Sequence, residues 1–260
     1  MKTLTTSIFF FLLFVSTNLI GQIKNGDKVA NIDKKIFVAG GVFDQVYIKY
    51  VAELTGKTNP KICYIATATG DNPAGIARWF TYCEDLPLRA YVLRTFINSA
   101  TFPKSFEEII MSMDAIVVGG GSTLNMMSVW KAQGIDTILK KAYEKGIVLS
   151  GSSAGSLCWF LGGSTDSRPK ELTLVDGLGL LNFSHSPHYL KETGRRPLYH
   201  QLILSGKLTA GYACDDLAGL LFVNGVMRRS VTMSADNNNY FVSLKDGKII
   251  EELLPAEILK

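Results

Sequence analysis

Cysteine and histidine, which supply many metal ligands, are scarce in this sequence. Among 260 residues there are four cysteines and three histidines. The cysteine spacing matches no zinc pattern, and most of the cysteines lie in apolar stretches, so we predict buried free thiols, although the sequence does not exclude a disulfide. His185 and His188 would need a third ligand to hold a metal, and none is evident. We therefore expect neither a metal nor another cofactor.

Blocks of like charge and the usual nucleotide-binding motifs are absent as well. Charged residues make up 19% of the chain, hydrophobic residues 47%, and the formal net charge is +4. This composition is typical of a globular protein, and the charge is too small to predict nucleic-acid binding. The chain also lacks the Gly-x-Gly-x-x-Gly fingerprint and the Lys-Ser/Thr pair of a P-loop, which argues against a nucleotide.

No apolar run reaches the roughly 20 residues that a membrane-spanning helix needs. The N-terminus instead has a basic Lys2, a short apolar run over residues 8–15 and small residues up to Gly21. This order is typical of a secretory signal, so we predict a signal peptide over residues 1–21 and export to the periplasm or the medium. After cleavage we expect no membrane contact. An uncleaved membrane anchor is the alternative.

After residue 30, short apolar runs alternate with stretches of helical spacing. This alternation predicts an α/β fold with a doubly wound, mostly parallel sheet flanked by helices. We expect strands over residues 35–39, 61–66, 90–93, 115–118 and 147–150. We expect helices over residues 45–54, 75–84, 106–113, 124–131, 135–144 and 154–161.

The last third of the chain has a different pattern. Asn224-Gly225 and Asp246-Gly247 each separate two apolar runs, and such dipeptides are strong hairpin signals. We therefore expect the sheet to end in C-terminal antiparallel hairpins. Because the sequence contains neither a repeat nor a low-complexity linker, we predict a single domain over residues 30–260.

One segment has the pattern of a nucleophile elbow. The apolar run 147–149 leads into Gly151-Ser152-Ser153-Ala154-Gly155, and an apolar helical stretch follows. A tight turn between strand and helix requires small residues two positions before and after the nucleophile, which Gly151 and Gly155 provide. The N–H of Ala154 would then face a developing oxyanion. We predict Ser153 as the nucleophile; the alternative is a loop in which Ser153 only caps a helix.

A second glycine-rich turn follows the strand expected at 115–118. Gly119-Gly120-Gly121 precedes Ser122, Thr123 and a helix. Free N–H groups at such a turn bind anions, so the turn would complete an oxyanion hole opposite Ser153.

A serine nucleophile needs a base and an acid that orients it. His188 lies just after an apolar run, in a loop where sites gather, whereas His200 lies in a helical, surface-like stretch. Asp215 and Asp216 end another apolar stretch, and because neighbours in an extended segment face opposite sides, only one of them should reach His188. Asp166 is a third candidate for the acid.

Five segments together resemble one family of serine peptidases, which includes dipeptidase E, an α-aspartyl dipeptidase, and cyanophycinase. In order along the chain they are residues 60–66, 117–124, 151–155, 177–189 and 211–216. The likeness runs from about Lys35 to the C-terminal hairpins. The resemblance implies a fold similar to that of the class I glutamine amidotransferases.

The resemblance also implies roles for single residues. Ser153 matches the family's nucleophile, His188 its histidine and Asp216 its acidic third member, which is usually Glu. The N–H of Gly120 or Gly121 and that of Ala154 match the oxyanion hole. Ser122 stands where Asn or Asp is usual, so we expect it, with Thr123, near the substrate.

The family's substrates are short peptides with an N-terminal Asp, or a β-linked aspartyl-arginine polymer. An arginine would suit such an acidic group, because its fork binds a carboxylate, and Arg195 and Arg196 are nearest to His188 in sequence. A solvated helix start is the alternative for both. A small peptide is the expected partner, and the sequence leaves a homodimer open. An esterase with Asp176 as the acid, and a silent binding protein on the same fold, are the other candidate functions.

Overall fold

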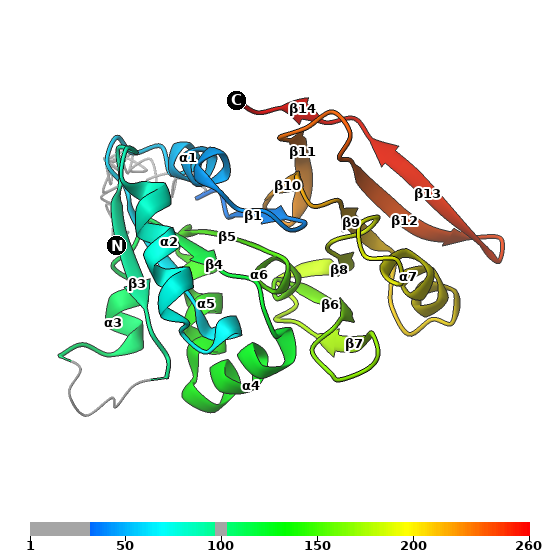
Figure 1. Ribbon diagram of the computed structural model, residues 1–260, viewed down its shortest axis with the longest axis horizontal. Helices are drawn as coiled ribbons and strands as arrows, with labels where there is room; N and C mark the ends of the chain where they lie inside the picture. Colours follow the sequence, from blue (N-terminus) through cyan, green and yellow to red (C-terminus); the bar gives the residue numbers. More distant parts are fainter. Residues whose placement is uncertain (1–31, 97–102) are drawn as a thin grey trace, which may run out of the picture. The chain divides into compact units, whose positions relative to one another are not determined.

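Five parallel strands form the centre of an eight-stranded sheet, in the order β1-β5-β4-β2-β3 (Figure 1). The computed structural model describes residues 32–96 and 103–260, so the predicted signal peptide at residues 1–21 lies outside the described residues. The five strands are β1 (Lys35–Ala39), β2 (Lys61–Ile65), β3 (Arg89–Leu93), β4 (Ala115–Val118) and β5 (Val148–Ser152). This sheet confirms the predicted doubly wound α/β class.

Helices cover both faces of this sheet. On one face lie α1 (Gln45–Leu54) and α2 (Pro73–Cys83); on the other lie α3 (Phe106–Ile110), α4 (Thr123–Gln133) and α5 (Ile135–Glu144). Successive side chains of a strand point to opposite faces. In β1, accordingly, Phe37 packs with α1 and α2, whereas Ile36 and Val38 pack in the core cluster with α3, α4 and α5. Apolar residues on both faces explain why the strands read as continuous apolar runs.

The first C-terminal hairpin extends this sheet, as predicted. Strand β10 (Ala218–Val223) pairs antiparallel with β1, and β11 (Val226–Thr232) pairs antiparallel with β10. The short β14 (Glu257–Ile258) follows β11 at the edge. The Asn224-Gly225 turn has φ angles of 53° and 78°, which these two residue types adopt most easily.

The structure contains a second sheet of six strands, which was not predicted. The other C-terminal hairpin belongs to this sheet. Its order is β13-β12-β9-β8-β6-β7, and α7 (Arg195–Leu204) packs against it. Its strands are β6 (Phe160–Thr165), β7 (Thr173–Asp176), β8 (Leu181–Ser186), β9 (Gly211–Cys214), β12 (Asn239–Lys245) and β13 (Lys248–Leu254).

The helix predicted over residues 154–161 is wrong in its second half. Helix α6 covers only Ala154–Leu157, and Phe160 already begins β6. Two glycines, Gly162 and Gly163, weaken a helix here and fit the strand. The backbone of β8 approaches so closely that a side chain at Gly163 would collide with the carbonyl oxygen of His185.

Two further expectations concern single residues and the membrane. All four cysteines are buried and unpaired, as their apolar neighbours suggested. Within residues 32–96 and 103–260, no helix has both the length and the apolar character to cross a membrane.

Candidate active site

Ser153 occupies a strained turn between β5 and α6. Its φ and ψ angles are 54° and −119°, a region in which a non-glycine residue is disfavoured by about 1–3 kcal/mol. Backbone hydrogen bonds hold the turn in place: Ser156 and Leu157 donate to the Ser153 carbonyl at 3.0 Å each, and the Ser153 N–H donates to Ala39 at 3.2 Å. Gly155 has no room for a side chain, because an added Cβ would lie 2.6 Å from the Val118 carbonyl carbon. The local structure is therefore a tight strand-to-helix turn of the kind predicted for this segment.

Ser153, His188 and Asp216 form a continuous chain of hydrogen bonds. The Ser153 Oγ lies 2.9 Å from His188 Nε2, and His188 Nδ1 lies 2.7 Å from Asp216 Oδ1. His188 follows β8, and Asp216 lies between β9 and β10, so both sheets contribute to the arrangement. Because a carboxylate only accepts, it keeps the proton on Nδ1 and leaves the Nε2 lone pair facing the serine hydroxyl.

The structure distinguishes the three candidate acids by their contacts. Asp215 is 4% exposed and points away from His188; its carboxylate accepts the backbone N–H groups of Leu190 at 3.2 Å and Asn238 at 2.9 Å. Asp166 instead lies 3.4 Å from the Arg195 guanidinium. Only Asp216 contacts His188, and Asp215 holds the loop on which His188 is carried.

The surroundings of Asp216 favour its charged form. Burial by itself would raise the pKa of this carboxyl group, but hydrogen bonds from His188 and from Lys191 Nζ, which is 3.0 Å away, outweigh burial and leave the pKa below its ordinary value. The opposite holds for Asp215, whose pKa is raised because burial outweighs its two backbone hydrogen bonds. Asp216 is therefore an anion at neutral pH, as the orienting acid of a histidine base must be.

The glycine-rich turn after β4 lies directly beside the elbow. A Cβ added to Gly120 would lie 3.1 Å from Ser153 Cβ, and Gly121, with φ 135°, packs on the backbone of Ala68. Among the described residues, the backbone N–H groups of Gly120, Gly121 and Ala154 donate to no protein acceptor. They are free to bind an oxyanion formed at Ser153.

Of the four weaker candidates for substrate contact, Ser122, Arg195 and Arg196 have partners within the protein and Thr123 is buried. Ser122 Oγ accepts the N–H of Asn125 at 3.3 Å and so caps α4, and Thr123 is 2% exposed. Arg195 is also 2% exposed; it contacts Glu192 at 2.5 Å and Asp166, and it donates to the Ser164 carbonyl at 2.7 Å.

Arg196 binds both oxygens of Glu251 at 3.0 Å each. Both arginines are therefore committed to ion pairs, and Arg195 is not the solvated helix start that we considered as the alternative.

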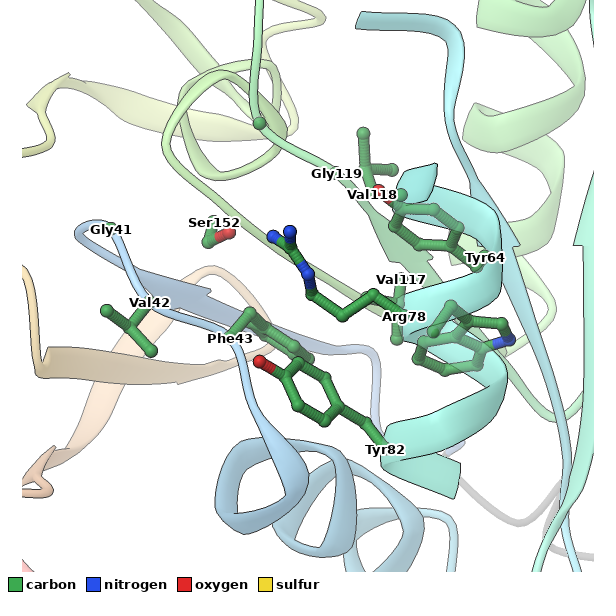
Figure 2. Close-up of a pocket in the computed structure, with 13 residues that line it drawn as sticks. Gly41, Val42, Phe43, Tyr64, Arg78, Tyr82, Val117, Val118, Gly119 and Ser152 are labelled. Carbon is green, nitrogen blue, oxygen red and sulfur yellow. The ribbon is translucent and has the colours of Figure 1, made fainter. Parts of the chain in front are cut away.

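A cavity of about 390 Å³ opens between the elbow and α2. We call it the Arg78 pocket; it is lined by Phe43, Tyr64, Arg78, Trp79 and Tyr82, and by Gly41, Gly120 and Ser152. Figure 2 shows the Arg78 guanidinium extending toward Ser152 above the rings of Phe43 and Tyr82. No sequence motif marks Arg78. It lies more than a hundred residues from His188 in sequence. It reaches the site because β2, the strand before its helix, pairs with β4.

His185, the other histidine of β8 and the loop that follows it, is fully buried next to α6. Its ring stacks on Phe160 with centroids 4.4 Å apart, and its nitrogens contact Ser156 Oγ at 2.9 Å and the Tyr212 carbonyl at 3.0 Å. Burial lowers its pKa from 6.5 to about 3, against the carbonyl contact, which raises it. Over the described residues, no three His, Cys, Asp or Glu side chains are grouped as metal ligands would be.

The buried His185 predicts a loss of stability in mild acid. Below pH 6.5 the unfolded chain binds a proton at this residue and the folded chain does not until about pH 3, so the free energy of unfolding should fall as the pH falls. The slope from this one group is up to about 1.4 kcal/mol per pH unit. Urea unfolding between pH 7 and pH 4 measures it. The variant His185→Gln should show a shallower slope than the parent, and equal slopes would contradict the assignment.

Comparisons with known proteins agree with this geometry. The sequence matches the model of Peptidase family S51 over residues 36–229. It is 38% identical over 211 residues to an uncharacterised peptidase, YgaJ, of Bacillus subtilis (strain 168), covering 81% of this chain and 90% of that protein.

Two solved structures share the fold. A peptidase from an acI-B1 Actinobacterium superposes with a TM-score of 0.65 at 16% identity, over 87% of this chain and 96% of the other. A protein from Listeria monocytogenes EGD-e called a peptidase E superposes with a TM-score of 0.58 at 18% identity, over 78% of this chain and all of the other.

Proposed function

Because the chain belongs to peptidase family S51 and is a serine-type peptidase, we propose that Ser153, His188 and Asp216 are its catalytic triad. We propose further that it hydrolyses short peptides whose N-terminal residue is acidic. The observation that carries the first proposal is the hydrogen-bonded chain from the Ser153 hydroxyl through His188 to the Asp216 carboxylate. These linked hydrogen bonds argue against a silent binding protein, which would have no need of them.

The geometry supports a two-step hydrolysis. Ser153 Oγ attacks the carbonyl carbon of the scissile bond while His188 Nε2 takes its proton, and Asp216 stabilises the resulting imidazolium. The N–H groups of Gly120 or Gly121 and of Ala154 bind the oxyanion. His188 then gives the proton to the leaving amine, and an ester with Ser153 remains. Water, activated by His188, attacks this ester and restores the free serine.

The acidic preference rests on the resemblance of five segments to dipeptidase E and its relatives. The surroundings of Ser153 and His188 are consistent with a short substrate, because the glycine turn after β4 lies close to Ser153 and the Gly41 loop after β1 lies close to His188.

A panel of matched peptides tests the substrate. We expect Asp-Leu to be cleaved at least about 30-fold faster, by kcat/KM, than the isosteric Asn-Leu, because a site built for a carboxylate leaves a charge unpaired when it binds an amide. Released leucine is the readout, and protein labelled beforehand by a serine-directed fluorophosphonate is the control.

Other outcomes would select other functions. Cleavage of only the β-aspartyl-arginine polymer would indicate a cyanophycinase-like enzyme, and cleavage of only p-nitrophenyl esters would indicate an esterase. Absence of both turnover and labelling at Ser153 would contradict the proposed triad.

A further inference from the structure

Four aromatic side chains line the Arg78 pocket. Tyr64 and Trp79 stack with centroids 5.4 Å apart and an interplanar angle of 14°. Phe43 and Tyr82 lie across the Arg78 side chain from Tyr64 (Figure 2). Aromatic walls and a volume of about 390 Å³ suit a large apolar group. They do not suit an aspartyl side chain, which is short and polar.

Arg78 brings a single positive charge into these apolar surroundings. In the described part of the chain, no carboxylate lies within ion-pair distance of its guanidinium, unlike those of Arg195 and Arg196. Its charge acts on the pocket. Burial raises the pKa of the Tyr64 hydroxyl, and the charge of Arg78 offsets part of that rise. A planar guanidinium with free donors is the group that pairs best with a carboxylate.

The pocket reaches the neighbourhood of His188 through Gly41. A Cβ added to Gly41, which lines the pocket, would be 2.8 Å from His188 Cε1. His188 has to deliver its proton to the leaving amine, so the released residue lies against this histidine. The pocket therefore begins where the residue after the scissile bond is placed.

We propose that the Arg78 pocket binds the residue released by cleavage, with its C-terminal carboxylate paired to Arg78 and a large apolar side chain against the aromatic walls. This inference rests on the proposed serine-peptidase site and adds the leaving side of its substrate. A carboxylate at this position exists only when the released residue ends the peptide. The pocket thus selects dipeptides, or peptides cleaved before their last residue, over longer chains.

Removal of the guanidinium separates this role from recognition of the N-terminal acid. In the parent we expect kcat/KM for Asp-Phe to exceed that for Asp-Phe-amide by about 10- to 100-fold, the range of a charge-assisted hydrogen-bonded pair. Arg78→Gln should remove this preference and lower kcat/KM for Asp-Phe accordingly. It should leave Asp-p-nitroanilide, whose leaving group has no carboxylate, nearly unchanged. Arg228→Gln, at an exposed position of β11, is the matched control.

Two results would overturn the inference. An equal loss on Asp-Phe and Asp-p-nitroanilide would mean that Arg78 binds the N-terminal acidic side chain instead. Unchanged kinetics of Arg78→Gln on Asp-Phe would mean that it binds no part of the substrate.

A binding measurement keeps the inference testable if no peptide is turned over. By calorimetric titration, the parent should bind L-phenylalanine but not L-phenylalaninamide, and Arg78→Gln should bind neither. Arg78-dependent binding without any turnover would contradict the proposed function and support the pocket assignment. Turnover of Asp-p-nitroanilide by a parent that does not bind L-phenylalanine would support the proposed function and contradict the pocket assignment.

Discussion

The variant Ser153→Ala is expected to lower kcat by about 10⁴- to 10⁶-fold on whichever peptide the parent cleaves best. The loss is this large because the acyl-enzyme route disappears, and only the oxyanion N–H groups and substrate binding continue to act. The folded state should be nearly unaffected. In the described part of the chain, the Ser153 hydroxyl makes a hydrogen bond only with His188, whereas the bonds that hold the elbow come from its backbone, which alanine keeps.

The neighbouring serine provides a matched control. Ser152 stands next to Ser153 in the same motif, is 6% exposed and lines the Arg78 pocket. Its hydroxyl is not hydrogen-bonded to His188, so Ser152→Ala should lose far less kcat than Ser153→Ala and should still be labelled by a fluorophosphonate. Steady-state kinetics and mass mapping of the labelled peptide measure both effects. If Ser152→Ala were inactive and Ser153→Ala remained active, the nucleophile would be Ser152 and not Ser153.

The variant Asp216→Asn should lower kcat by about 10³- to 10⁴-fold without unfolding the protein. An amide in this position offers an N–H to His188 Nδ1, which favours the tautomer with its proton on Nε2, and that nitrogen then cannot take the proton of Ser153. The lost negative charge also leaves the imidazolium of the transition state unpaired. Kinetics together with the melting temperature measure the two effects separately.

Asp215→Asn is the contrasting variant. It replaces one of the two carboxylate oxygens that accept the N–H groups of Leu190 and Asn238. We expect a loss of about 1–3 kcal/mol of stability from a buried N–H left unpaired, and a smaller loss of kcat than in Asp216→Asn. If Asp215→Asn instead had the larger effect on kcat at unchanged stability, the assignment of the acid would be reversed.

The central sheet was predictable because its signals are local. The bounds of β1 and α1 match the residue patterns at 35–39 and 45–54, since strands buried on both faces are continuous apolar runs and a surface helix shows one apolar side. The elbow was predictable for a similar reason. Only a turn without room for a Cβ requires glycine on both sides of Ser153, and the close approach of Gly155 to Val118 is that requirement in three dimensions.

The second sheet was not predictable because its strands are defined by partners distant in sequence. Strand β9 has the sequence GYAC, which contains no β-branched residue, unlike the AIVV of β4, and it becomes a strand by pairing with β8 and β12. The pairing of His188 with Asp216 depends on the same sheet, which carries both loops to the edge of the first sheet.

By itself, the sequence determined the α/β class and the strand-to-helix turn that carries Ser153, because each of these follows from a short run of neighbouring residues. The resemblance pointed to Asp216 while the residue pattern left Asp215 open, and only the tertiary structure shows that Asp216 contacts His188 whereas Asp215 accepts two backbone N–H groups. The same holds for Arg78. Its place in a pocket with Gly120 and Ser152 comes from the pairing of β2 with β4, a contact between segments that no local pattern records.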